Sequence, residues 1–101
     1  MYTVLQSGAF TEWVSGLKDA RARARVAARV RRVELGNFGD SKSVGAGVSE
    51  MRIDHGPGYR LSFTVRDQSL ILLLCGGDKR TQVSDIRRAQ RMVSELKRDS
   101  T

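Results

Sequence analysis

Hydrophobic residues recur with a helical period near the start of the chain, over residues 8–18. Spacings of three, four and seven place them on one face of an amphipathic helix, and Ser7 is a suitable N-cap residue. A second helix is predicted over 20–35, where alanine and valine repeat on one face, arginine repeats on another, and Gly36 follows. The two segments predict a helical hairpin. Its apolar positions are Phe10, Trp13, Val14 and Leu17, then Ala22, Val26, Val30 and Val33.

The pattern changes to alternation in the middle of the chain. Residues 59–66 alternate apolar and polar, which is typical of a half-buried strand, and residues 50–54 alternate in the same way. The His-Gly-Pro-Gly sequence at 55–58 predicts a turn that joins these strands into a hairpin. After a tight turn at 67–68, residues 70–75 are apolar throughout, as expected of a strand covered on both faces.

Helical period returns near the C-terminal end, with Thr81 as the expected cap of a last helix. Residues 36–47 are dense in turn-forming residues and predict a loop, whereas a short strand at 2–6 would add an edge. We therefore expect an α+β fold, a single domain over 1–101. In it, the N-terminal helical hairpin packs on one face of a small antiparallel sheet of three to four strands, and the C-terminal helix packs on the same face.

Composition restricts the class of protein. The chain has 101 residues and a formal net charge of +7, with 14 Arg and 4 Lys. Arginine binds phosphates and carboxylates through two parallel hydrogen bonds, so nucleic acid or an acidic protein is the expected partner. The single cysteine, Cys75, is expected in the core and predicts a reducing, cytoplasmic location. No signal-peptide pattern or membrane-spanning run is present, and neither a cofactor nor a metal is expected.

The alternating strands bring polar residues together on one face of the predicted hairpin. Because the apolar face must meet the helices, this polar face is expected to be open to solvent. Its arginine pair is a candidate phosphate site, and solvated cross-strand charges are the alternative interpretation. The residues of this face are Glu50, Arg52, Arg60 and Ser62.

Other basic residues also have two interpretations each. Lys79 stands between the apolar strand and the last helix, either near an anion site at a helix N-terminus or in a plain connecting turn. His55, the only histidine, is either a base or a residue that tolerates an unusual turn backbone, and the turn role is favoured. The basic helix face either binds nucleic acid or packs against an acidic partner. The candidate RNA-binding residues are Arg25, Arg29, Arg32 and the loop residue Lys42.

Several short segments, taken in order and spacing, together resemble one family. They are Gly36-Asn37-Phe38-Gly39-Asp40-Ser41-Lys42, Glu50-Met51-Arg52, Gly56-Pro57-Gly58-Tyr59-Arg60, and Leu73-Leu74-Cys75-Gly76-Gly77-Asp78-Lys79 with Gln82, Asp85-Ile86 and Ala89. Nearly the whole chain resembles the addiction-module killer proteins, the HigB-like branch of the RelE/ParE toxin superfamily. The resemblance implies a ribosome-dependent, metal-free endoribonuclease that cuts mRNA in the decoding site. It also implies a HigA-like antitoxin with a helix-turn-helix domain, which holds the toxin inactive in a hetero-oligomer.

By position, the resemblance implies catalytic roles for three cations. Arg60 matches the transition-state arginine, Arg52 falls where a basic residue is usual, and Lys79 falls on the leaving-group side. Glu50 stands where some relatives have a second lysine, and Asp85 where some have a catalytic tyrosine, so the general base stays open. Candidates for the base or for a supporting role are Lys42, Glu50, Arg52, His55, Tyr59, Asp78 and Asp85.

Two other functions are open on the sequence alone. A toxin of the same fold can inhibit DNA gyrase without cutting RNA, and a basic module can simply bind nucleic acid or protein. Induction of an endoribonuclease depletes transcripts, whereas a gyrase inhibitor damages DNA while mRNA is at first intact. A binding module does neither.

Overall fold

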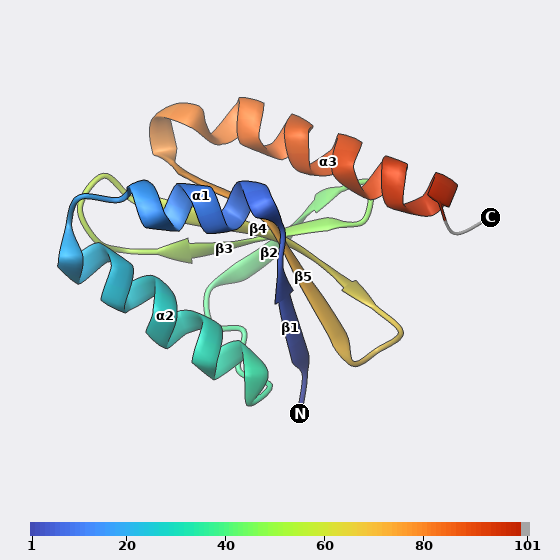
Figure 1. Ribbon diagram of the computed structural model, residues 1–101, viewed down its shortest axis with the longest axis horizontal. Helices are drawn as coiled ribbons and strands as arrows, with labels where there is room; N and C mark the ends of the chain where they lie inside the picture. Colours follow the sequence, from blue (N-terminus) through green and yellow to red (C-terminus); the bar gives the residue numbers. More distant parts are fainter. Residues whose placement is uncertain (100–101) are drawn as a thin grey trace.

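The computed structural model describes residues 1–99, and its five strands form one mixed sheet in the order β1-β5-β4-β3-β2. β1 pairs with β5 in parallel, and every other neighbouring pair is antiparallel. Figure 1 shows the helices around this twisted sheet. In chain order the elements are β1 (Thr3–Gln6), α1 (Gly8–Gly16), α2 (Ala20–Glu34), β2 (Ser41–Gly45), β3 (Val48–Ile53), β4 (Tyr59–Arg66), β5 (Leu70–Asp78), a 3₁₀ turn η1 (Lys79–Thr81) and α3 (Gln82–Asp99).

Side-chain caps determine where the helices begin. The Ser7 hydroxyl accepts from the Phe10 N–H at 3.0 Å and starts α1, as predicted. At the C-terminal helix, Thr81 is not the cap that the sequence predicts. Asp78 instead accepts from the Arg80 N–H at 2.8 Å, and Thr81 is its reciprocal partner, so the helical turn starts three residues earlier.

The helices cover both faces of the sheet, which corrects the expectation of a single covered face. One core lies under α1 and α2 and includes Phe10, Val26 and Leu61, whereas a second core lies under α3 and includes Leu74 and Val93. α1 also packs more extensively on β5 than on α2, so the two N-terminal helices are held mainly by the sheet. The apolar strand at 70–75 requires this arrangement, because its side chains alternate to both faces.

The sheet has five strands where three or four antiparallel ones were expected. β2 lies inside the predicted loop at 36–47 and pairs with β3, and β1 confirms the predicted edge strand but runs parallel to β5. β2 is an edge strand of mostly exposed residues, so backbone pairing holds it and no apolar alternation marks it in the sequence.

Two consecutive glycines in β5 allow the two helical layers to approach the strand closely. A Cβ at Gly76 would lie 2.2 Å from the Trp13 ring of α1, and a Cβ at Gly77 would lie 1.9 Å from the Asp85 carboxylate of α3. The side chains at these positions would point to opposite faces, so each glycine accommodates a different layer. Gly77 pairs with Arg60, and the α3 layer therefore begins directly beside the candidate phosphate site.

Candidate functional site

A hollow of about 310 Å³ lies at the end of the sheet where β3 ends and β4 begins. Arg52 and Arg60 line it and are directly opposite each other in the antiparallel register. Like charges at such a position repel one another, so the pair requires compensating carboxylates. The lining residues are Asp40, Arg52, Ile53, Asp54, Gly58, Tyr59 and Arg60.

Arg52 is held by an exposed carboxylate. Its Nε lies 3.1 Å from Asp40 Oδ2 and its Nη2 lies 3.4 Å from Asp40 Oδ1, a two-pronged ion pair. The Arg52 side chain is 48% exposed and that of Asp40 is 61% exposed. Exposed ion pairs contribute little net free energy, so an incoming phosphate can exchange with Asp40 for the Arg52 guanidinium.

Arg60 is held by a buried carboxylate. Its Nε lies 3.6 Å from Glu50 Oε1, and its Nη1 donates to the Gly58 carbonyl at 2.9 Å. The Arg60 side chain is 14% exposed, whereas that of Glu50 is only 1% exposed. Glu50 and Ser62 are therefore not on an open face as predicted, because the start of α3 covers them. Gln82, the first residue of α3, donates to Glu50 Oε1 at 2.8 Å.

The structure assigns Arg29 a structural role, which corrects its prediction as an RNA-binding residue. Arg29 is buried, and its guanidinium donates to the Arg52 carbonyl at 2.6 Å and to the Phe38 and Asp40 carbonyls at 3.0 Å each. Burial lowers the pKa of Arg29 below its ordinary value, and the nearby Arg32 lowers it further. Arg29 thus ties α2 to the segment that carries both Asp40 and Arg52.

Arg25 and Arg32 are exposed on α2 and line a second hollow of about 280 Å³. This second hollow shares Ile53 and Asp54 with the first, so the basic face of α2 is continuous with the arginine pair. Lys42 is exposed on β2 and is directly opposite Glu50, on the same face of the sheet as Arg52 and Arg60.

His55 does not line the hollow and lies in the turn between β3 and β4, but its φ is not positive, so it does not serve there by tolerating an unusual backbone. Its Nε2 lies 3.1 Å from Asp19 Oδ2, and its ring stacks on Tyr59 with the centroids 6.4 Å apart. Hydrogen bonding to His55 lowers the pKa of Asp19, which also caps α2 by accepting from the Arg21 N–H. Tyr59 borders the hollow, but its buried ring belongs to the core beneath α1 and α2.

The remaining predicted residues lie where β5 leads into α3. Lys79 is exposed and follows Asp78, the residue opposite Tyr59 in the sheet, so it lies at the same end of the sheet as the hollow without lining it. Asp78 is an ion-pair and cap residue whose pKa is lowered by its hydrogen bond to Arg80. Asp85 accepts from Thr81 Oγ1 at 2.6 Å, above Gly77.

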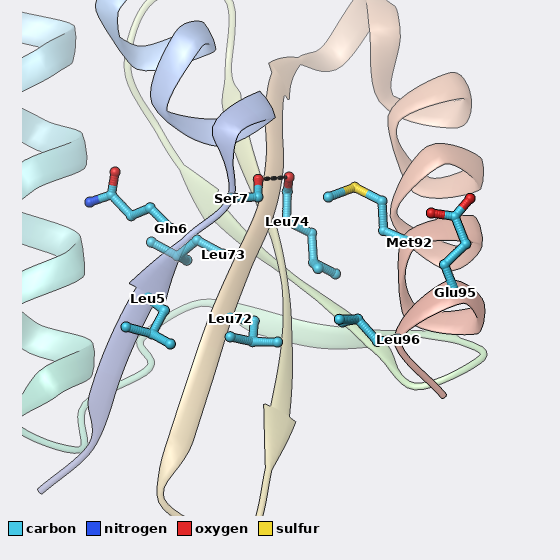
Figure 2. Close-up of a pocket in the computed structure, with 9 residues that line it drawn as sticks. All are labelled: Leu5, Gln6, Ser7, Leu72, Leu73, Leu74, Met92, Glu95 and Leu96. Carbon is cyan, nitrogen blue, oxygen red and sulfur yellow. Dashed lines mark hydrogen bonds between the residues drawn. The ribbon is translucent and has the colours of Figure 1, made fainter. Parts of the chain in front are cut away.

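An apolar cavity elsewhere in the molecule differs in character from this site. It has a volume of about 370 Å³ and lies between β1, β5 and α3, where Leu5, Leu72, Met92 and Leu96 face a common depression (Figure 2). Its lining contains no Lys or Arg. Cys75 lies in the core beneath α3, and burial raises the pKa of its thiol, in agreement with a core role.

Sequence reasoning missed three residues of the site. Asp40 and Gln82 belong to the family-like segments but were given no role, and Asp54 was treated only as part of a strand. A signal for Arg29 was available, because 22, 26, 29 and 33 are also spaced along one helical stripe. Within residues 1–99, no three His, Cys, Asp or Glu side chains come together as a metal site, and no helix is long and apolar enough to cross a membrane.

The chain belongs to a phage-derived family in the RelE/toxin-like group. The chain is a member of the family described as "Phage derived protein Gp49-like (DUF891)", whose model matches residues 12–94. It is similar to an uncharacterized protein of Haemophilus influenzae, with 49% identity over 87 residues, covering 86% of this chain and 88% of that protein. An antitoxin is the general partner of toxins in this group.

Proposed function

We propose that this protein is the toxin of a type II toxin–antitoxin module and is a metal-free endoribonuclease that cuts mRNA in the ribosomal decoding site. The observation that carries the proposal is the cross-strand pair Arg52 and Arg60, which lines a hollow at an exposed end of the sheet. Two adjacent guanidinium groups match the charge of a phosphodiester and of the more highly charged transition state of its cleavage.

In the proposed reaction, the RNA 2′-oxygen attacks the neighbouring phosphorus while its proton passes to a base. The P–O5′ bond breaks, the 5′-oxygen gains a proton, and the products are a 2′,3′-cyclic phosphate and a 5′-hydroxyl. Arg60 stabilises the extra negative charge on the phosphate oxygens, and Arg52 joins it after exchanging Asp40 for the phosphate.

Asp54 is our assignment for the proton acceptor. Glu50 is buried and accepts a hydrogen bond from Gln82, and His55 contacts Asp19. Asp40 is paired with Arg52, whereas Asp54 is an exposed residue that lines the hollow. A carboxylate that acts as a base must be ionised and within reach of the 2′-hydroxyl. Lys79, at the same end of the sheet, is proposed to stabilise the leaving 5′-oxygen.

The continuity of the two hollows supports an RNA path that leads from the arginine pair to α2. Arg25 and Arg32 would bind further phosphates of mRNA or ribosomal RNA, and Lys42 would do so on the β2 side. Binding through several phosphates releases counterions, so ribosome association is expected to weaken steeply with salt. A HigA-like antitoxin is the proposed inhibitory partner.

The deciding experiment is cleavage of a defined mRNA with and without programmed 70S ribosomes. Wild-type protein should cut only with ribosomes, and Arg60→Lys, which keeps the charge but loses the forked geometry, should cut about a hundredfold more slowly. A wild-type protein that cuts under neither condition would contradict the proposal, and inhibition of DNA gyrase would then be tested.

A further inference from the structure

A chain of contacts connects the start of α3 to the candidate catalytic arginine. Gln82 donates from Nε2 to Glu50 Oε1 at 2.8 Å, and the same oxygen lies 3.6 Å from Arg60 Nε. Three different elements, α3, β3 and β4, supply the three residues. Because one carboxylate oxygen serves both neighbours, the orientation of Glu50 determines what Arg60 contacts.

Burial makes this carboxylate sensitive to each of its contacts. Glu50 is 1% exposed, so water cannot replace a lost partner, and a buried charge needs both a counter-charge and hydrogen bonds. Arg60 Nε is buried and makes no hydrogen bond within residues 1–99, so the guanidinium relies on the nearby Glu50 charge. Its Nη1 is held by the Gly58 carbonyl at 2.9 Å.

The position of Gln82 is itself well determined. Asp78 and Thr81 form a capping box immediately before it, and Thr81 Oγ1 donates to Asp85 Oδ2 at 2.6 Å, over Gly77. Gln82 lies outside the lining of the hollow, so it reaches the phosphate site only through other side chains.

We propose that Gln82 is a positioning residue that orients Arg60 toward RNA through the buried Glu50 carboxylate. This proposal rests on the proposed function for its catalytic consequence, but the orientation of Arg60 is a property of the protein alone. Loss of the Gln82 amide should let the carboxylate rotate, so that Arg60 points less well at the phosphate while keeping its charge.

The first test compares Gln82→Met with Gln90→Met in ribosome-dependent cleavage. Gln90 lies on the same helix and donates to the Val44 carbonyl at 3.1 Å, away from the hollow, so it is a matched control for losing one glutamine hydrogen bond. Gln82→Met should lower the cleavage rate at saturation about tenfold or more, with half-saturation unchanged, and Gln90→Met should change neither. A changed half-saturation with an unchanged rate would overturn the proposal.

The Gln82→Asn variant tests whether the lower rate of Gln82→Met results from misfolding. It keeps an amide that is one methylene too short to reach Glu50, and it should lose the same rate. Its thermal unfolding should remain cooperative, at a melting temperature lowered by several degrees because the buried carboxylate has lost a donor. The double variant Glu50→Gln/Gln82→Met should be no slower than Glu50→Gln alone, because Gln82 acts only through that carboxylate. Multiplying losses would show a separate role and would refute the proposal.

A measurement without RNA separates this proposal from the proposed function. The ¹⁵Nε–H resonance of Arg60, assigned by its loss in Arg60→Lys, should move in Gln82→Met and stay in place in Gln90→Met. If the resonance moves while the wild-type protein cuts no RNA, the positioning role stands and the nuclease function fails. If cleavage is normal in wild type and the resonance does not move, Gln82 does not orient Arg60.

Discussion

Arg52 and Arg60 lie directly opposite each other on β3 and β4, and each is paired with its own carboxylate. The Asp40 partner of Arg52 is exposed, whereas the Glu50 partner of Arg60 is buried. The two guanidinium groups therefore differ in freedom. Arg60 is fixed within the sheet, and Arg52 can exchange its carboxylate for a ligand at little cost in free energy.

Asp40→Asn should strengthen RNA binding. The substitution removes the carboxylate that competes with phosphate for Arg52, but the Asp40 backbone carbonyl still accepts from Arg29. We expect affinity for a short RNA to rise roughly two- to fivefold, as befits an exposed ion pair. Fluorescence anisotropy at fixed salt would measure this, and unchanged or weaker binding would count against phosphate exchange at Arg52.

Asp54→Asn should slow RNA cleavage without weakening RNA binding. If Asp54 accepts the 2′-hydroxyl proton, its amide cannot, and the cleavage rate on ribosomes should fall by about 10²–10⁴. RNA affinity should be equal to wild type or slightly higher, because a negative charge has been removed. Full activity in this variant would eliminate Asp54 as the base, with Asp40→Asn as the matched carboxylate control.

Arg29→Met should destabilise the fold strongly. Three carbonyl oxygens, of Phe38, Asp40 and Arg52, would lose a charged donor in a site that is largely closed to water. We expect a loss of about 3 kcal/mol, or roughly 10–20 °C in melting temperature. Arg25→Met, on the exposed face of the same helix, should change the melting temperature by only a few degrees at most. Equal changes in melting temperature for the two variants would contradict the structural role of Arg29.

Asp19→Asn should reduce stability more at neutral pH than in acid. The folded-state pKa of Asp19 is lowered, chiefly by its hydrogen bond to His55, so its charge stabilises the fold above the unfolded carboxyl pKa of about 3.9. That contribution disappears as pH falls through the folded pKa. Asparagine can still cap α2, so only the charge is removed. Urea unfolding of both proteins at pH 7 and pH 3 should give a smaller difference at pH 3 than at pH 7, and an equal difference would contradict this role of the charge.

Much of the fold was predictable because the apolar pattern carries it. The stripe from Phe10 to Leu17 predicted α1, and the alternation from Tyr59 to Arg66 predicted β4 and its apolar face. The opposite face is not open as predicted, because Ser62 and Thr64 are buried. β2 was not predictable, since its mostly exposed residues pair through the backbone alone. The apolar run at 70–75 indicated a strand covered on both faces, but the expectation of one covered face followed the order of elements, which does not specify the side on which a terminal helix packs.

The candidate site was predictable only in part. Alternation predicted that Arg52 and Arg60 share a face, and the register confirms it. It could not predict that Glu50, on the same face, is buried, because burial there depends on where α3 begins. The contact between Asp40 and Arg52 likewise depends on β2, which was expected to be a loop.

Gly76 and Gly77 bring side chains of both helical layers close to one point of β5. Trp13 approaches from one side and Asp85 from the other, at neighbouring positions of the same strand, and neither position has room for a methyl group. The distances from the sheet to the helices on each side therefore depend on these two glycines, and Gly77 lies directly opposite Arg60 on the neighbouring strand. An added methyl group at Gly76 would force the Trp13 ring of α1 away from the sheet, whereas one at Gly77 would displace the Asp85 and Thr81 side chains at the start of α3.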